Sequence, residues 1–112
     1  MTQTIALNDT SFIQTPLDIE GIVSLCQNYR IKELSLFGSV IRDDFDYDNS
    51  DIDILVEFLP DSPVESLLDL IKVKFAFSDL LGRDVDLVEK RALSPYIRDR
   101  VLKSRRVIYV CA

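Results

Sequence analysis

The segment at residues 50–58 constrains this chain more than any other, because acidic and apolar side chains alternate along it. Successive residues of a β-strand point to opposite faces, so Asp51 and Asp53 would lie side by side on one face. Adjacent carboxylates repel each other unless a cation lies between them. Mg²⁺ favours carboxylate oxygens and commonly shares its site with substrate phosphates. The alternative for an isolated Asp-x-Asp pair is a solvated strand edge.

A second acidic strand repeats this pattern at residues 84–88, with the sequence Asp-Val-Asp-Leu-Val. If the two strands pair, Asp86 reaches the same cleft as Asp51 and Asp53. Three carboxylates could then hold two metal ions, which two-metal sites place about 3.5–4 Å apart to clamp the attacking and leaving oxygens of phosphoryl chemistry. Asp84 competes for this role, and we favour Asp86 because its position inside the strand is fixed.

The dipeptide Gly38-Ser39 follows an alternating strand at residues 32–37 and precedes a short helix expected from residue 40. Glycine lets the backbone approach a ligand closely, and the start of a helix presents free N–H groups to an anion. The Ser39 hydroxyl adds a donor, and Arg42 lies one helical turn further on. Separately, these residues would be an ordinary turn, an N-cap and a surface cation. Their order ahead of the acidic strand favours a phosphate-binding site.

Helix and strand signals alternate along the rest of the chain. Thr15-Pro16 followed by acids predicts a helix to about Tyr29, and Ser62-Pro63 opens the longest helix, which Gly82 ends. We therefore expect an α/β (α+β) fold in one domain, residues 15–112, after an N-terminal arm at 1–14 that could include a short helical turn. The expected order is helix 15–29, strand 32–37, a helix beginning at 40–42, strand 51–58, helix 63–81, strand 84–88, helix 94–103 and strand 107–110.

The longest helix carries two apolar stripes instead of one. We expect both to be buried, with a surface for another subunit as the alternative. The first stripe contains Val64, Leu67, Leu68, Ile71 and Phe75, and the second contains Leu70, Val73, Phe77 and Leu81.

Between these elements, residues 43–50 form an acidic stretch that has two further interpretations. Asp46, Asp48, Ser50 and Glu57 fall at calcium-loop spacing, but Asp51 stands where such a loop needs glycine, and a strand pattern follows. The stretch is therefore not expected to bind calcium. It is either solvated or able to meet a basic partner surface.

Composition narrows the function classes. The formal charge is −6, which argues against general binding of nucleic acid, and the chain has no histidine. Acid–base chemistry would fall to carboxylates, Lys or Tyr. Cys26 and Cys111 lack metal-binding spacing. No signal peptide is apparent, and no apolar run approaches the roughly 20 residues of a membrane span, so a cytoplasmic protein is expected.

Three segments together resemble the minimal nucleotidyltransferase (MNT) domain of the DNA-polymerase-β-like superfamily. They are residues 36–42 (Leu-Phe-Gly-Ser-Val-Ile-Arg), residues 50–58 and residues 82–88. The resemblance runs from about residue 17 to the C-terminus and implies the nucleotidyltransferase fold, a small mixed β-sheet flanked by helices. It implies that Gly38 and Ser39, with Arg42, hold the triphosphate of ATP. The stretch from Arg42 to Asp51 departs from relatives, which often have a glycine after the arginine and a shorter segment with a proline.

The same resemblance implies the roles of the acids and of a partner. Asp51 and Asp53 would bind two Mg²⁺ ions, and Asp86 would bind the catalytic ion and help deprotonate the acceptor. Standalone MNT proteins of this size are typically antitoxins that transfer AMP from ATP to a tyrosine of a HEPN-family ribonuclease toxin. The alternatives are a small-molecule nucleotidyltransferase and a non-catalytic antitoxin that acts by occlusion.

Overall fold

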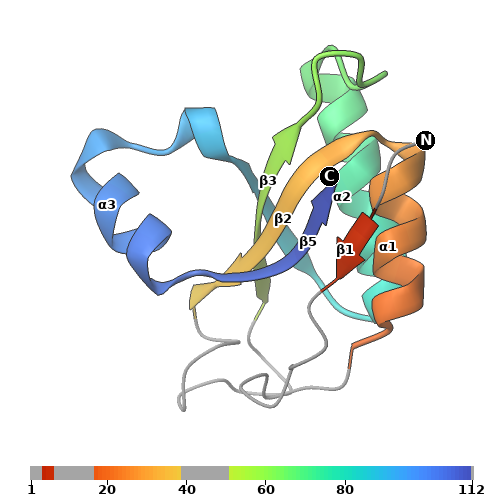
Figure 1. Cartoon of the computed structure of the whole chain (residues 1–112), viewed down its shortest axis with the longest axis horizontal. Helices are drawn as coiled ribbons and strands as arrows, with labels where there is room; N and C mark the ends of the chain where they lie inside the picture. Colours follow the sequence, from red (N-terminus) through yellow and green to blue (C-terminus); the bar gives the residue numbers. More distant parts are fainter. Residues whose placement is uncertain (1–3, 7–16, 39–50, 112) are drawn as a thin grey trace.

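The structure is a computed structural model that describes residues 4–6, 17–38 and 51–111 (Figure 1). Its centre is a five-stranded mixed sheet with the strand order β1-β5-β2-β3-β4. This confirms the expected fold class. The strands are β1 (Thr4–Ala6), β2 (Ile31–Phe37), β3 (Ile52–Phe58), β4 (Val85–Glu89) and β5 (Arg106–Cys111), and the helices are α1 (Ile19–Asn28), α2 (Leu67–Leu81), the 3₁₀ turn η2 (Lys90–Ala92) and α3 (Pro95–Ser104).

Only one neighbouring pair in the described sheet is parallel. Strands β3 and β4 run in the same direction, joined by the crossover helix α2, whereas β2 is antiparallel to both β3 and β5. The C-terminal end of β2 therefore lies beside the N-terminal ends of β3 and β4, at one end of the strands.

The two faces of the sheet are covered differently. On one face, α1 and α2 pack over the large core, which includes Ile22, Ile54 and Phe77. On the other face, a smaller cluster joins Leu55 of β3 to Leu93 and to Val101 of α3. Figure 1 shows α3 standing apart from α1 and α2, on the opposite side of the strands.

Helix α2 begins later than its sequence pattern predicts. The pattern placed the start near residue 63, but Ser66 and Asp69 form a capping box, in which the Asp69 N–H donates to the Ser66 hydroxyl at 3.2 Å and the Ser66 N–H donates to the Asp69 carboxylate at 3.2 Å. Residues 63–66 are thus the lead-in to the helix. Gly82, with a left-handed φ of 69°, ends the helix as predicted.

The expectation that both stripes of α2 are buried is wrong. Val73 and Phe77 of the second stripe are fully buried against the sheet. Of the first stripe, Val64 precedes the helix and packs against the large core, whereas the four residues within the helix face outward and are exposed: Leu67, Leu68, Ile71 and Phe75.

The N-terminal segment also departs from expectation. Residues 1–14 were predicted as a loose arm with a possible helical turn, but Thr4–Ala6 form strand β1 and pair antiparallel with β5. Helix α1 starts at Ile19, after Asp18 caps it by accepting a hydrogen bond from the Gly21 N–H at 2.9 Å. The short helix expected at 40–42 lies outside the described residues.

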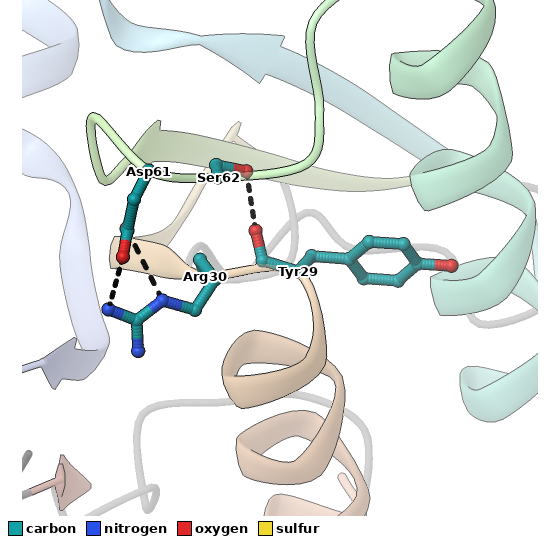
Figure 2. Close-up of polar contacts among 4 residues, drawn as sticks. All are labelled: Tyr29, Arg30, Asp61 and Ser62. Carbon is teal, nitrogen blue, oxygen red and sulfur yellow. Dashed lines mark hydrogen bonds and ion pairs between the residues drawn. The ribbon is translucent and has the colours of Figure 1, made fainter.

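The end of the sheet opposite the acids is fixed by polar contacts between two turns (Figure 2). The Arg30 guanidinium pairs with Asp61 at 2.8 Å, and the Ser62 hydroxyl donates to the Tyr29 carbonyl at 2.6 Å. The Leu59 N–H donates to the Arg30 carbonyl at 2.9 Å. The hydrogen bond from Arg30 holds the pKa of the Asp61 carboxyl below its usual value. These contacts join the turn after α1 to the turn after β3.

Among the described helices, none is long and apolar enough to cross a membrane.

Candidate active site

The predicted acids lie at the end of the sheet where β2 finishes and β3 and β4 begin. Asp53 and Asp86 are register partners on the parallel strands β3 and β4, so their side chains leave the same face of the sheet. Asp51 immediately precedes β3, and the Ile52 N–H donates to the Asp84 carbonyl at 3.1 Å, which extends the pairing to the start of both strands. The strand register therefore brings the acidic segments together as the sequence predicted.

Gly38 lies against the Asp53 carboxylate. It follows Phe37, the register partner of Asp53 at the end of β2. Its φ is +73°, a conformation that favours glycine, and a Cβ atom added there would overlap the Asp53 carboxylate. Position 38 therefore needs glycine for two reasons, the backbone angle and the close approach of the carboxylate.

A pocket of about 410 Å³ opens beside these strands. Asp51, Asp84 and Asp86 line it, but Asp53 does not. Sequence reasoning missed three further lining side chains, which come from the C-terminal half of α2. The i, i+1, i+4 spacing that puts them on one helix face could have identified them once α2 was known to lie beside β4. They are Lys74, Phe75 and Ser78.

The donor chemistry at this edge fits magnesium, since carboxylate oxygens are its usual protein ligands. Within residues 4–6, 17–38 and 51–111, however, no group of three or more His, Cys, Asp or Glu side chains is gathered closely enough to hold a metal ion. Asp51 and Asp86 face the pocket, whereas Asp53 faces Gly38. Shared metal binding would therefore require these side chains to turn toward one another about an already aligned backbone.

Ser39 and Arg42, the other predicted phosphate ligands, lie outside the described residues. Gly38 is the one predicted phosphate-binding residue whose surroundings the structure describes.

A larger pocket, of about 570 Å³, lies at the opposite end of β3. Its charged side chains are largely paired with each other: Lys90 contacts Glu57 at 3.5 Å, and Arg91 contacts Glu89 at 2.7 Å. Glu57 lies within strand β3 and not at the start of a helix, where a calcium loop would place it, whereas Asp46, Asp48 and Ser50 lie outside the described residues. The smaller pocket is the better candidate, because it gathers Asp51, Asp84 and Asp86 with Lys74 as its one lysine, no ion pair joins these acids to another described residue, and Gly38 lies at the same end of the strands.

The sequence matches the family described as the nucleotidyltransferase domain over residues 20–108. A relative from Methanocaldococcus jannaschii, named as a candidate protein adenylyltransferase, is 37% identical over 81 residues, which cover 72% of this chain and 83% of the relative. The chain therefore belongs to the nucleotidyltransferase domain family, a class of enzymes.

Solved structures share this fold. A candidate minimal nucleotidyltransferase is 37% identical, with a TM-score of 0.64 over 78% of this chain and 85% of that one. A toxin–antitoxin structure with AMP-PNP is 25% identical, with a TM-score of 0.67 over 81% of this chain and 72% of that one. A structure of a tri-AMPylated Shewanella oneidensis HEPN toxin with its MNT antitoxin is 23% identical, with a TM-score of 0.58 over 80% and 66% of the two chains. The minimal nucleotidyltransferase resemblance is thereby confirmed.

Proposed function

We propose that this protein is a cytoplasmic antitoxin that transfers AMP from ATP to a tyrosine hydroxyl of a cognate HEPN-family toxin. The observation that carries the proposal is the register of β3 and β4, which aligns Asp53 with Asp86 next to Gly38. Carboxylates aligned beside a close-approach glycine suit a triphosphate and its metal ions.

In this proposal, the tyrosine oxygen attacks the α-phosphorus of ATP. A new P–O bond forms to the tyrosine, the bond to the bridging oxygen breaks, and pyrophosphate leaves. Asp86 accepts the tyrosine proton, directly or through water, and Gly38 with Ser39 and Arg42 holds the triphosphate. Asp51, Asp53 and Asp86 would hold two Mg²⁺ ions, which supply charge neutralisation of the phosphates when bound. The acids thus orient both reactants at the end of the strands.

The relatives support the donor and the partner in this proposal. The neighbour with AMP-PNP holds an ATP analogue, and the Shewanella oneidensis complex pairs an MNT antitoxin with an AMPylated HEPN toxin. The matched nucleotidyltransferase domain spans residues 20–108, and a partner protein would supply most of the surface around a large acceptor. An added AMP would place a negative phosphate and a nucleoside over the toxin tyrosine, which would block a surface that binds RNA.

The test is label transfer from [α-³²P]ATP with Mg²⁺ to the protein encoded beside this chain. We expect transfer by the wild type and a loss of about 10³-fold or more in Asp53→Asn and Asp86→Asn. Asp79→Asn is the matched control, because Asp79 is an exposed acid on α2 that does not line the pocket. Comparison with Asp84→Asn shows which acid of β4 is used.

Other outcomes would refute the proposal. If Asp53→Asn still neutralised toxicity as well as the wild type, the protein would act by occlusion. If label appeared on a small molecule and not on the toxin, the acceptor assignment would be wrong. Unchanged transfer in the presence of EDTA would contradict the role of the metal ions.

A further inference from the structure

The formal charge of −6 is distributed unevenly along the chain. Residues 90–106 contain seven of the 13 basic residues and a single acid, Asp99, so their formal charge is +6. The rest of the chain contains six basic and 18 acidic residues, a formal charge of −12. The whole-chain charge, which argues against general binding of nucleic acid, therefore conceals a strongly basic segment.

Helix α3 presents part of this basic charge to solvent on one side. Tyr96, Arg100 and Lys103 are spaced four and three residues apart, which places them on the same side of the helix. All three are exposed, whereas Val101 packs into the cluster between α3 and the sheet. Figure 1 shows α3 on the side of the strands away from α1 and α2. We call these three residues the basic face of α3.

The cations of α3 are not neutralised by acids of the described chain. In residues 4–6, 17–38 and 51–111, no ion pair joins Arg98, Arg100 or Lys103 to a carboxylate. By contrast Arg105, which follows the helix, is mostly buried and pairs with Glu33 at 3.2 Å. The structural cation is therefore paired, and the exposed ones are available to a ligand.

An exposed aromatic ring among these cations favours a single-stranded nucleic acid over an acidic protein. Tyr96 is 93% exposed, so its ring adds nothing to the core. Unpaired bases stack on such rings, while arginine and lysine contact the phosphates. Carboxylates of an acidic protein would pair with the cations but would offer no plane to stack on the ring. Tyr96 and Lys103 are seven residues apart, roughly 10 Å at 1.5 Å per residue, which is the axial length of about three nucleotides.

We propose that the basic face of α3 binds a short segment of single-stranded nucleic acid, about three nucleotides long. One base stacks on the Tyr96 ring. The neighbouring phosphates contact Arg100 and Lys103, with Arg98 beside them. These contacts read base faces and phosphates, so binding is independent of sequence, and repulsion from the acidic rest of the chain keeps the Kd in the micromolar range. The proposal does not depend on the transfer of AMP.

The test measures the fluorescence anisotropy of a labelled oligouridylate of about 12 nucleotides at a series of salt concentrations. Three cations on phosphates predict that log K falls against log [salt] with a slope of about −2. Arg100→Gln/Lys103→Gln should weaken binding about 10-fold or more and reduce the slope to about −0.7. Tyr96→Ala should weaken binding about 5-fold or more and leave the slope unchanged, because it removes stacking but no charge.

The matched control is Lys72→Gln/Lys74→Gln, which removes two exposed cations from α2, on the other side of the sheet. This control should bind the oligouridylate like the wild type, and every variant should keep the wild-type Tm. An equal loss of binding in the control would assign the effect to net charge and refute the proposal. An oligothymidylate of the same length should bind with a similar Kd, since the proposed contacts do not include the sugar.

Three other results would overturn the proposal. The first is no binding of oligouridylate by the wild type at about 100 μM protein and low salt. The second is such an absence together with loss, in Arg100→Gln/Lys103→Gln, of binding to the protein encoded beside this chain, which would assign the basic face to an acidic protein. The third is a wild-type dimer in sedimentation velocity that the same variant dissociates, which would assign it to a second copy.

Discussion

Replacing Gly38 by alanine tests two structural requirements at this position, the positive φ angle and the close approach of the Asp53 carboxylate. The φ of +73° costs an alanine about 1–2 kcal/mol. In addition, the new Cβ would overlap the Asp53 carboxylate, but that group is the end of a side chain and can rotate away at a further cost of about 1 kcal/mol. We therefore expect Gly38→Ala to lower stability by about 2–3 kcal/mol. Because Asp53 is displaced by on the order of 1 Å, AMP transfer should fall about 100-fold or more.

Gly82→Ala is the control for the backbone term. Gly82 has a similar φ of +69°, and a Cβ added there would meet nothing within 4 Å. Its cost should be the backbone term alone, about 1–2 kcal/mol, with AMP transfer retained. Thermal unfolding resolves the difference, since each kcal/mol shifts the Tm of a domain of this size by roughly 4–8 °C. Equal loss of AMP transfer in both variants, or full transfer in Gly38→Ala, would refute the contact with Asp53.

Three stability measurements test the fold itself. Phe77→Ala removes a fully buried ring and should cost about 3–5 kcal/mol, whereas Phe75→Ala on the same helix, 61% exposed, should cost less than about 1 kcal/mol by urea unfolding. Ser66→Ala breaks the capping box and should cost about 1 kcal/mol by the same assay, so no change would place the start of α2 elsewhere. Because Arg30 lowers the pKa of Asp61, the ion pair stabilises the fold above the ordinary carboxyl pKa of about 4, and this contribution is lost as the pH falls through the lower folded value. The stability difference between wild type and Asp61→Asn should therefore shrink below about pH 4, and a gap that widened on acidification would contradict the contact.

The candidate site was predictable from sequence to the extent that it depends on strand geometry. The period of two along residues 51–58 and 84–88 assigned the acids to one face of each strand, and the register of Asp53 with Asp86 agrees with it. The order of the motifs also located Gly38 at the end of the preceding strand. The rest of the pocket wall was not predictable, because Lys74 and Ser78 reach the site only through the packing of α2 beside β4.

Where the observed fold differs from the sequence prediction, the physical cause lies outside the local sequence pattern. The start of α2 depends on which of several polar residues caps it, and Ser66 with Asp69 provides a reciprocal pair that Ser62 does not form. Strand β1 exists because β5 offers a free edge, which is a property of the assembled sheet. An apolar stripe on a helix predicts burial, but the sequence does not say whether the same chain or another molecule would bury it.

The two faces of the sheet are covered unequally around the acids. Leu55 and Val88 are register partners, and on their face of the sheet they pack in the cluster that α3 covers. Asp53 and Asp86 stand two residues earlier on the same two strands, and therefore on the same face, where Asp86 is exposed. Among residues 4–6, 17–38 and 51–111, helices α1 and α2 pack over the opposite face of the sheet, and Asp86 is left exposed. An exposed site suits the proposed function, in which a large acceptor would bring its hydroxyl to the acids and would itself exclude water from the reacting groups.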